Sequence, residues 1–331
     1  FVQADPIRAP ARAQDLTLRH RVAGYRAGDL ERLYPGLAFE EDAFVNYGFL
    51  PRAHHHLMHP RVARNRWGPA TTRRSLDVLA FVRERGEAHP RDVDAALAHG
   101  AVRNAWGGSS NATTHLLDGM HYRGLLRVAR RDNGIRVYTA REPTAGAAGA
   151  AERKARLDAL VDVLVRKYAP IPAARFNPLV RRLRYGVPQW RADFDGALRR
   201  AQSRLAHGRV DGVDWVWPAD EDPRVGDDAA IDRARLLAPF DPVVWDRLRF
   251  ERFWGWAYRF EAYTPPAARK LGYYALPLLW RDHVVGWANL AVAGTVLQST
   301  FGFVAGRRPG GVAFARELER ELADLRRFLA L

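Results

Sequence analysis

The chain has 331 residues, which is enough for two or three domains that each bury a core. Its 52 Lys and Arg residues exceed its 37 Asp and Glu residues, which gives a net charge of +15. This charge favours a protein that binds a polyanion over one whose basic surface has no partner. Cysteine is absent, which excludes disulfides, thiol catalysis and Cys-ligated metal centres, and neither a membrane span nor a secretory signal is visible, as in a cytoplasmic protein.

The first seven residues, FVQADPI, place an amide and a carboxylate two positions apart in an apolar setting. If this segment is extended, Gln3 and Asp5 point to the same side of the chain. Pro6 fixes the backbone after the pair and disfavours a helix at Asp5. A carboxylate beside an amide suits an active site, although the spacing alone is more typical of a polar strand end that caps the next helix.

Residues 1–70 predict a first domain that begins before residue 1, because the chain lacks an initiating Met and opens inside a structured segment. Apolar residues at helical spacing predict a helix within Arg12–Leu33. Four histidines follow at 54–56 and 59. Consecutive histidines cannot all face one ion, and no Asp or Glu stands near them in a ligand pattern. Core packing or contact with a nucleic-acid backbone is therefore favoured over a metal site.

Residues 71–142 predict a second domain built from three helices and a hairpin. The expected elements are helices over 75–85, 90–97 and 111–123 and strands over 125–129 and 135–139. Gly86 and Gly124 follow the first and third helices, at the position where glycine commonly ends a helix. Asn133-Gly134 between the strands is a strong hairpin signal. Three helices followed by a hairpin predict a winged helix-turn-helix, with the hairpin as its wing.

A linker rich in Ala and Gly over 143–151 leads to a third domain over 152–218. Its expected elements are helices over 152–168, 176–184 and 190–205 and a strand-like stretch over 210–217. This order repeats that of the second domain and predicts another winged helix with a reduced wing.

Residues 234–331 change character and predict a β-rich subdomain with a C-terminal helix. The expected elements are strands over 236–242, 273–280 and 283–290, a tight turn at Arg281-Asp282, and an amphipathic helix over 311–331. Leucine and phenylalanine recur along one face of that last helix, as in a helix that packs on a core.

Basic residues recur where a winged helix faces DNA and beside the opening motif. The candidate DNA-binding residues are Arg8, Arg12, Arg64, Arg66, Arg103, Arg130, Arg131, Arg181, Arg182 and Arg184. Such residues hold phosphates and give salt-dependent affinity without sequence information. Glycine-rich phosphate loops are absent, which argues against nucleotide-driven motors and dehydrogenases. The acidic clusters at 220–222 and 227–228 are more typical of solvated loop charge than of a two-metal nuclease site.

Five segments carry a resemblance to one protein family. They are residues 1–7, 11–16 (ARAQDL), 237–247 (LAPFDPVVWDR), 258–265 (YRFEAYTP) and 272–280 (GYYALPLLW). Over nearly its whole length the chain resembles the YcaQ/AlkZ family of bacterial DNA glycosylases, which unhook interstrand crosslinks and remove N7-alkylated purines. The resemblance implies an α+β, mainly helical fold of three tandem winged helix-turn-helix domains around a basic concave surface, with a small β-rich C-terminal subdomain and a terminal helix. Residues 1–70, with the opening motif, would be the first of these winged-helix domains.

The family's catalytic motif is Gln-x-Gln in one branch and Gln-x-Asp in the other, and Gln3 and Asp5 match the second, YcaQ-like branch. The family's N-terminal helices precede this motif, in agreement with a domain that begins before residue 1. Many relatives carry an aromatic-Gly-His element where this chain has Tyr47-Gly48-Phe49, so a role for that histidine is not carried over.

No lysine lies near the Gln-x-Asp motif in the sequence, so we expect a monofunctional, hydrolytic glycosylase, without cofactor or metal. Asp5 would stabilise an oxocarbenium-like sugar and activate the water that attacks C1′, with Gln3 orienting the water or Asp5. The expected partner is double-stranded DNA with alkylated or crosslinked purines, bound by a monomer at the nucleoid. A non-catalytic winged-helix regulator and a structural nucleoid protein are the alternatives, and neither gives Gln3 and Asp5 a task.

Overall fold

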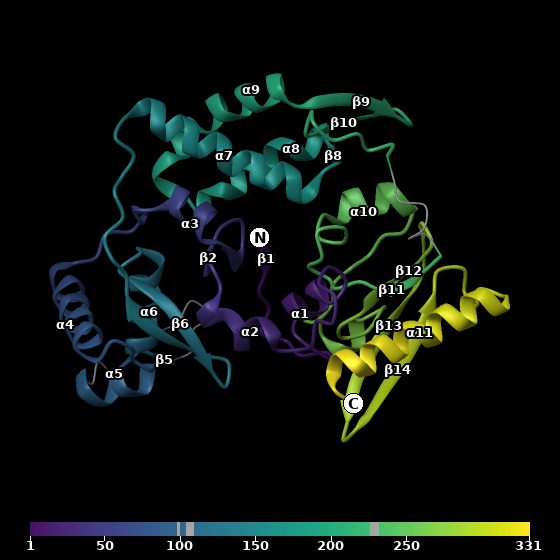
Figure 1. Cartoon of the computed structure of the whole chain (residues 1–331), viewed down its shortest axis with the longest axis horizontal. Coiled ribbons are helices and arrows are strands. Elements are labelled where there is room, and N and C mark those ends of the chain that lie inside the picture. Colours follow the sequence, from purple (N-terminus) through teal and green to yellow (C-terminus); the bar gives the residue numbers. More distant parts are fainter. Residues whose placement is uncertain (98–99, 104–108, 226–231) are drawn as a thin grey trace. The chain divides into compact units, whose positions relative to one another are not determined.

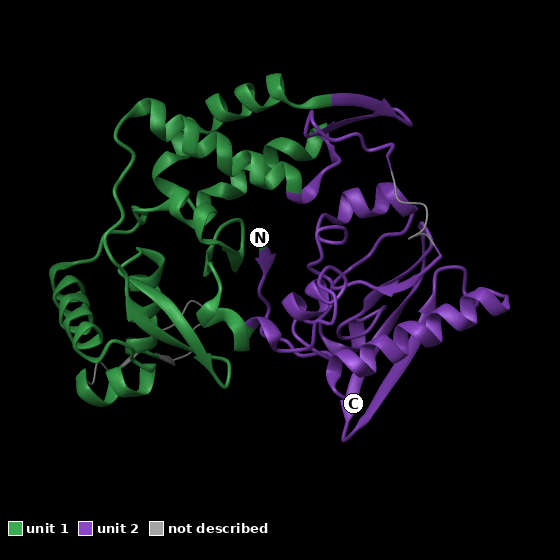
Figure 2. Ribbon diagram, viewed as in Figure 1, with its two compact units in different colours: residues 1, 31–166, 173–206 green, residues 2–30, 167–172, 207–331 purple. Residues whose placement is uncertain are grey.

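The computed structural model describes residues 1–97, 100–103, 109–225 and 232–331, which form an α+β fold of helices and small antiparallel sheets (Figure 1). The chain divides into two compact units (Figure 2). The first holds residues 1, 31–166 and 173–206, and the second holds residues 2–30, 167–172 and 207–331. The predicted four-domain division has other boundaries, since its domains 1–70 and 152–218 each include residues of both units, and it stays a prediction.

The first unit contains a hairpin of β2 (Phe39–Ala43) and β3 (Tyr47–Pro51), followed at once by α3 (Arg52–Met58). A short 3-10 helix over Tyr34–Gly36 precedes the hairpin. The central residues of β2 are all acidic and all buried: Glu40, Glu41 and Asp42. Buried carboxylates need partners inside the protein, so we expect basic side chains to contact this strand.

The helices and hairpin predicted for 71–142 are confirmed in type and order. The elements are α4 (Pro69–Arg85), α5 (Pro90–Leu97), α6 (Ala112–Tyr122), β6 (Leu126–Asp132) and β7 (Ile135–Ala140), with the pair β4 (Ala101–Arg103) and β5 (Ser109–Asn111) before α6. The Asn111 side chain caps α6 by accepting the Thr114 N–H at 3.0 Å. Asn133 and Gly134 have φ of 49° and 85°, the left-handed conformations that a two-residue hairpin turn requires.

The same order recurs after the linker. The elements are α7 (Ala150–Tyr168), β8 (Ile171–Pro172), α8 (Ala173–Val180), 3-10 helices over Arg181–Tyr185 and Pro188–Asp193, α9 (Phe194–Arg204), β9 (Ala206–Val210) and β10 (Val213–Trp217). Asp211 and Gly212, with φ of 49° and 75°, turn the chain between β9 and β10. The predicted order of three helical segments and a strand is therefore confirmed, and the strand is half of a hairpin.

The second unit is built on a four-stranded antiparallel sheet. Its strands are β11 (Ala234–Leu236), β12 (Leu276–Trp280), β13 (His283–Ala293) and β14 (Val296–Phe303), in this order. Arg281, at φ 56°, and Asp282 make the predicted turn. The helix α11 (Val312–Leu329) buries Phe314, Leu318 and Leu325 in the same core as the sheet. The predicted β-rich part with its terminal helix is confirmed.

The helix predicted within Arg12–Leu33 is wrong in its extent. The structure has α1 (Ala13–Leu18) and α2 (Asp29–Leu33) with an irregular segment between them. Gly24 and Gly28 in that segment have φ of 68° and 90°, which lies outside the helical range and interrupts the helix.

The strand predicted over 236–242 is also wrong, because β11 ends at Leu236. The chain instead turns at the fully buried Asp241, whose carboxylate accepts two hydrogen bonds from Arg21 at 2.7 and 2.9 Å. The unpredicted helix α10 (Arg247–Trp254) follows, capped by Asp246 and ended by Gly255 at φ 63°. A 3-10 helix lies over Pro266–Ala268. Across the described residues, no helix has the length and apolar character needed to span a bilayer.

Candidate active site

The segment that opens the chain is extended at β1 (Val2–Gln3), as predicted, and runs without regular structure to α1. Gln3 is half-buried, whereas Asp5 is buried with 7% of its surface exposed. Ile7 and Ala9 pack against the core of the second unit. The carboxylate therefore stands where the chain enters that core.

Two backbone contacts fix Asp5. Its N–H donates to Oε1 of Gln14 at 3.1 Å, and Gln14 is itself buried on α1. The Ile7 N–H donates to Oδ1 of Asp5 at 2.9 Å, which closes a turn around Pro6. The other oxygen, Oδ2, accepts no hydrogen bond from any described residue. One oxygen thus holds the carboxylate in place and the second is available to a water.

Burial raises the pKa of Asp5, and the hydrogen bond from the Ile7 N–H opposes this by favouring the charged form. A raised pKa suits a general base, because proton transfer is most effective when the pKa of the base is near the working pH. The site therefore has the burial, the fixed geometry and the electrostatics that a water-activating carboxylate needs.

Two tyrosines share the electrostatic environment of Asp5. Burial and then the Asp5 charge raise the pKa of Tyr274, which is buried in the core against which Ile7 packs. The Tyr274 hydroxyl has no hydrogen-bond partner in the described part of the chain. Burial and then Asp5 also raise the pKa of Tyr263, although its ring is 79% exposed. Sequence analysis had used both residues only as marks of a family resemblance.

Residues 1–328 match the model of the family described as DNA glycosylase AlkZ-like. The chain belongs to this family. It is accordingly a DNA glycosylase, a hydrolase that acts on N-glycosyl bonds, and the resemblance found in the sequence is confirmed.

The AlkZ-like chain also matches a solved structure, the Streptomyces sahachiroi DNA glycosylase AlkZ. The TM-score is 0.60 at 14% sequence identity, over 98% of this chain and 88% of that chain. At this identity the likeness shows a common fold and leaves the residues of the site to be argued from this chain.

Six of the ten predicted DNA-binding arginines fall into two groups. Arg8, Arg64 and Arg66 are exposed and make no ion pair within the described residues. Others lie beside an acidic side chain: Arg130 pairs with Glu87 at 2.9 Å, Arg181 with Asp195 at 2.5 Å, and Arg131 with the buried Glu41. The first group is therefore free to contact phosphates, whereas the second would have to share or exchange its partners.

The remaining arginine candidates are less informative. Arg184 is exposed and donates to the hydroxyl of Tyr185 at 3.0 Å. Arg12 and Arg182 are half-buried. Arg103 lies in β4, and its side chain is outside what the structure describes. The acidic residues at 227–228 and the Trp106–Gly108 segment also lie outside the described residues.

The histidine cluster has an acidic partner that sequence analysis missed. His55 and His59 each donate Nε2–H to Oδ2 of Asp42 at 2.9 Å, from 13 and 17 residues further along the chain. Arg61 donates to the other oxygen of Asp42 at 2.8 Å, and Arg141 donates to Nδ1 of His55 at 3.3 Å. The prediction of core packing for these histidines is confirmed for His55 and His59, which are both buried.

The Asp42, His55 and His59 side chains have the composition of a zinc-ligand set, and their ligand atoms lie within 4.8 Å of one another. The two imidazole rings are stacked at 4.3 Å, and both point at one carboxylate oxygen. Arg61 already supplies the positive charge that Asp42 needs. Burial lowers the pKa of His59 to about 3, so that its ring is neutral and donates to Asp42. The contacts are therefore explained by a buried charge network.

Phe49 stands where many relatives carry histidine, and it is a core residue here. Its ring lies edge-on to Tyr34, with the ring centroids 5.9 Å apart, and 4% of the residue is exposed. Phe49 contributes packing to β3 and offers no polar atom to a substrate.

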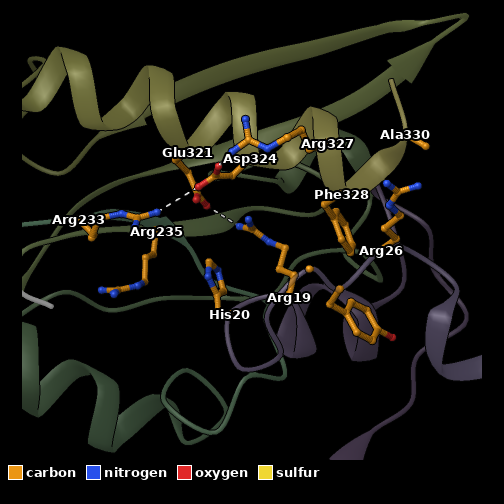
Figure 3. A pocket seen from close by; sticks show the side chains of 12 residues that line it. Arg19, His20, Arg26, Arg233, Arg235, Glu321, Asp324, Arg327, Phe328 and Ala330 are labelled. Carbon is orange, nitrogen blue, oxygen red and sulfur yellow. Dashed lines mark hydrogen bonds and ion pairs between the residues drawn. The ribbon is translucent and has the colours of Figure 1, made fainter.

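A cavity of about 580 Å³ lies in the second unit beside α11 (Figure 3). Five arginines line it: Arg19, Arg26, Arg233, Arg235 and Arg327. Arg19 pairs with Glu321, and Arg233 and Arg327 pair with Asp324. Glu321 and Asp324, the acidic residues of α11 that line the cavity, thus engage three of the arginines. None of the site residues predicted from the sequence lines this cavity.

Proposed function

We propose that this AlkZ-like protein hydrolyses the N-glycosidic bond of N7-alkylated purines in double-stranded DNA and unhooks interstrand crosslinks formed at such bases. The observation that carries the proposal is Asp5: a buried carboxylate with one oxygen held by a backbone N–H and the other unengaged among the described residues. Its place in a Gln-x-Asp motif assigns the chain to the YcaQ-like branch.

The substrate's chemistry sets what the protein must supply. Alkylation at N7 gives the purine a positive charge, so the C1′–N9 bond breaks with its electrons neutralising the departing base. The sugar becomes oxocarbenium-like, and the Asp5 carboxylate stabilises that charge. Asp5 then accepts a proton from the water that attacks C1′, while the Gln3 amide orients the water or Asp5. No general acid is required, because the leaving base departs neutral.

The DNA is held by the basic residues of the helical segments. We interpret the two segments of three helices and a hairpin, 71–142 and 152–218, as winged helices that contact the duplex. Arg8, Arg64 and Arg66 lie outside these segments and are exposed cations without an ion pair among the described residues. Phosphate contacts position a protein on DNA without reading its sequence, which suits an enzyme that searches for damage. Such a protein would act as a monomer at the nucleoid.

Asp5→Asn tests the chemistry, because it keeps the side-chain size and removes the base. We expect it to abolish release of 7-methylguanine from duplex DNA and to leave DNA affinity nearly unchanged. The Gln3→Ala variant should slow release without abolishing it. Full activity of the Asp5→Asn variant would refute the assignment of Asp5. Binding of DNA by the wild type with no release of base would instead favour a non-catalytic regulator.

A monofunctional enzyme forms no covalent imine with its product. The chain has three lysines, and none is near the Gln-x-Asp motif in sequence. Incubation with alkylated duplex and borohydride should therefore yield released base and no protein–DNA adduct. A trapped adduct would show that an amine attacks C1′ and would overturn hydrolysis by water.

A further inference from the structure

The loop from Tyr258 to Tyr274 in the second unit has no part in the proposed chemistry, yet it displays aromatic side chains. Tyr263 is 79% exposed, more than any other aromatic residue in the described part of the chain, and Tyr273 is 44% exposed. Large aromatic rings are normally at least half-buried because of the apolar surface they carry. An exposed ring of this size needs a reason outside the folding of the chain itself.

Several hydrogen bonds fix the conformation of this loop, so Tyr263 is exposed on an ordered segment. The buried Glu261 carboxylate accepts the backbone N–H groups of Lys270 and Leu271 at 2.8 and 2.7 Å. Arg269 donates through Nε to the backbone carbonyl of Thr264 at 2.8 Å. Residues on either side of Tyr263 are thereby fixed to the end of the loop, and the ring is held out in one place.

The Tyr263 ring also rests on an aromatic support. It lies edge-on to Phe260, with the ring centroids 6.0 Å apart. Phe260 in turn lies edge-on to the buried Tyr274 at 5.2 Å. One ring in a T-shaped contact covers at most one face of the other, and Tyr263 is 79% exposed, so it keeps a face available for a flat ligand.

The loop and the catalytic segment share a core. Ile7, which donates to Asp5, packs against the same buried cluster as Tyr274 and Phe260. Asp5 is near enough that its charge contributes to the raised pKa of Tyr263, after burial. The surroundings are basic as well: Arg269 lies 5.0 Å from the Tyr273 ring, and Arg259 and Lys270 are exposed on the same loop. These are the elements of a surface that binds nucleic acid, an aromatic face with cations beside it.

We propose that Tyr263 is a base-stacking residue of the active site, which packs its ring against a nucleobase next to the lesion and so holds the damaged nucleotide at Asp5. The proposal rests on the proposed function, because it assigns a role within that same site. Tyr263 acts as a positioning residue, and the expected ligand is a base of the duplex. Stacking of this kind is tolerant of sequence, since every base has a π-face.

The test compares Tyr263→Ala and Tyr263→Phe in the full chain. Release of 7-methylguanine is measured in single turnover with enzyme in excess, and the control is Val312→Ala, which removes another exposed apolar side chain from the second unit. We expect Tyr263→Ala to slow release about 10- to 100-fold, as loss of one base stack predicts. Tyr263→Phe should stay near wild type, because it keeps the ring, and Val312→Ala should be unchanged.

A second readout separates this inference from the catalytic proposal. Duplexes with 2-aminopurine beside the lesion report stacking as a loss of fluorescence, whether or not the base is released. Wild type, Asp5→Asn and Tyr263→Phe should quench the probe, and Tyr263→Ala should not. Equal release and equal quenching by Tyr263→Ala and wild type would overturn the inference. So would a Tyr263→Phe variant as slow as Tyr263→Ala. If the wild type releases no base, the proposed function fails, and the quenching still decides whether Tyr263 stacks.

Discussion

Burial and hydrogen bonding shift the pKa of the Asp5 carboxyl group in opposite directions. Burial disfavours the charge, the Ile7 N–H favours it, and burial is the larger effect, so the pKa of Asp5 lies above 3.8. A general base works only in its deprotonated form. Activity at low pH should therefore report the environment of this one group.

The rate of base release should fall as the pH is lowered through the raised pKa of Asp5, at a higher pH than an ordinary aspartate would give. The measurement is single-turnover release of 7-methylguanine across the acidic range, corrected with Asp5→Asn for spontaneous loss of the base. A rate that stays flat down to the pH at which the protein unfolds would show that Asp5 is not the titrating base.

Arg64 and Arg66 are exposed cations that no described carboxylate neutralises. Each phosphate contact adds about 0.9 to the slope of log K against log salt for duplex DNA. The Arg64→Ala/Arg66→Ala double variant should therefore bind undamaged duplex more weakly, with a slope lower by about 2.

The matched control for that variant is Arg307→Ala/Arg308→Ala, which removes the same charge from exposed positions of the second unit, outside the predicted DNA contacts. Fluorescence anisotropy at several salt concentrations measures both. If the two double variants lose equal affinity, net charge alone governs binding, and Arg64 and Arg66 hold no specific phosphates.

At the scale of elements, Asp42 joins β2 to α3 and to the segment after it. Its two oxygens take hydrogen bonds from His55, His59 and Arg61. Arg61 is itself buried and also donates to the carbonyls of Ala43 and Gly186. Burial raises the pKa of Asp42, but Arg61 and the two histidines outweigh it and hold that pKa well below its usual value.

Asp42→Asn should destabilise the protein by about 3–5 kcal/mol, because it leaves the Arg61 guanidinium buried without a counter-charge. The exposed pair of Arg73 and Asp77 offers the control, since Asp77→Asn should cost about 0.5 kcal/mol or less. Urea unfolding of the two variants measures the difference. Similar costs for both would mean that solvent, and not Asp42, neutralises Arg61.

Gly124 ends α6 at φ 77°, and a Cβ there would lie 2.6 Å from Nδ1 of His59. Gly86 ends α4 at a similar φ of 75°, with nothing within 4 Å of its Cβ position. Gly86→Ala should therefore cost about 1–3 kcal/mol from backbone strain alone, because a residue with a Cβ rarely adopts this conformation. Gly124→Ala should cost more, because His59 is held by Asp42 and cannot give way. Thermal unfolding compares them, and a smaller loss for Gly124→Ala would contradict the packing around His59.

These two glycines also show which parts of the fold could be predicted. Gly86, Gly124 and Asn133-Gly134 mark local conformations, and they place the helix ends and the hairpin of 71–142 correctly. The helix α10 has comparable local signals in Asp246 and Gly255, but its aromatic residues are also typical of strands.

The site depends on contacts that local patterns do not contain. Asp42 contacts His55 and His59 because the β2–β3 hairpin reverses the chain before α3. The spacing of these residues in the sequence does not predict the contact. Spacing alone favoured a strand-end cap for Gln3 and Asp5, and the family resemblance reversed that interpretation. The segments that carry Asp5 and Tyr263 are more than two hundred positions apart in the sequence. They share one core in the structure, and no local pattern in the sequence predicts this.

For the whole molecule, buried histidines in both units set how stability depends on pH. Burial lowers the pKa of His55 and His121, and lowers those of His20 and His59 to about 3. In the unfolded chain each histidine titrates near 6.5, so below that pH the unfolded state binds more protons than the folded state. The stability that these histidines contribute is therefore complete above about pH 6.5 and is lost as the pH falls from about 6.5 toward 3.

His59→Gln should make that loss shallower, because glutamine can still donate to Asp42 but does not titrate. His115→Gln, at an exposed position of α6, should keep the wild-type slope. The measurement is the urea midpoint at a series of pH values from about 7.5 to 5, above the usual pKa of glutamate. Contacts with Arg141 and Arg131 oppose burial and lower the pKa values of the neighbouring Glu40 and Glu41. Equal slopes for His59→Gln and wild type would mean that His59 binds protons equally in the folded and unfolded states, which would contradict the lowered pKa of its buried ring.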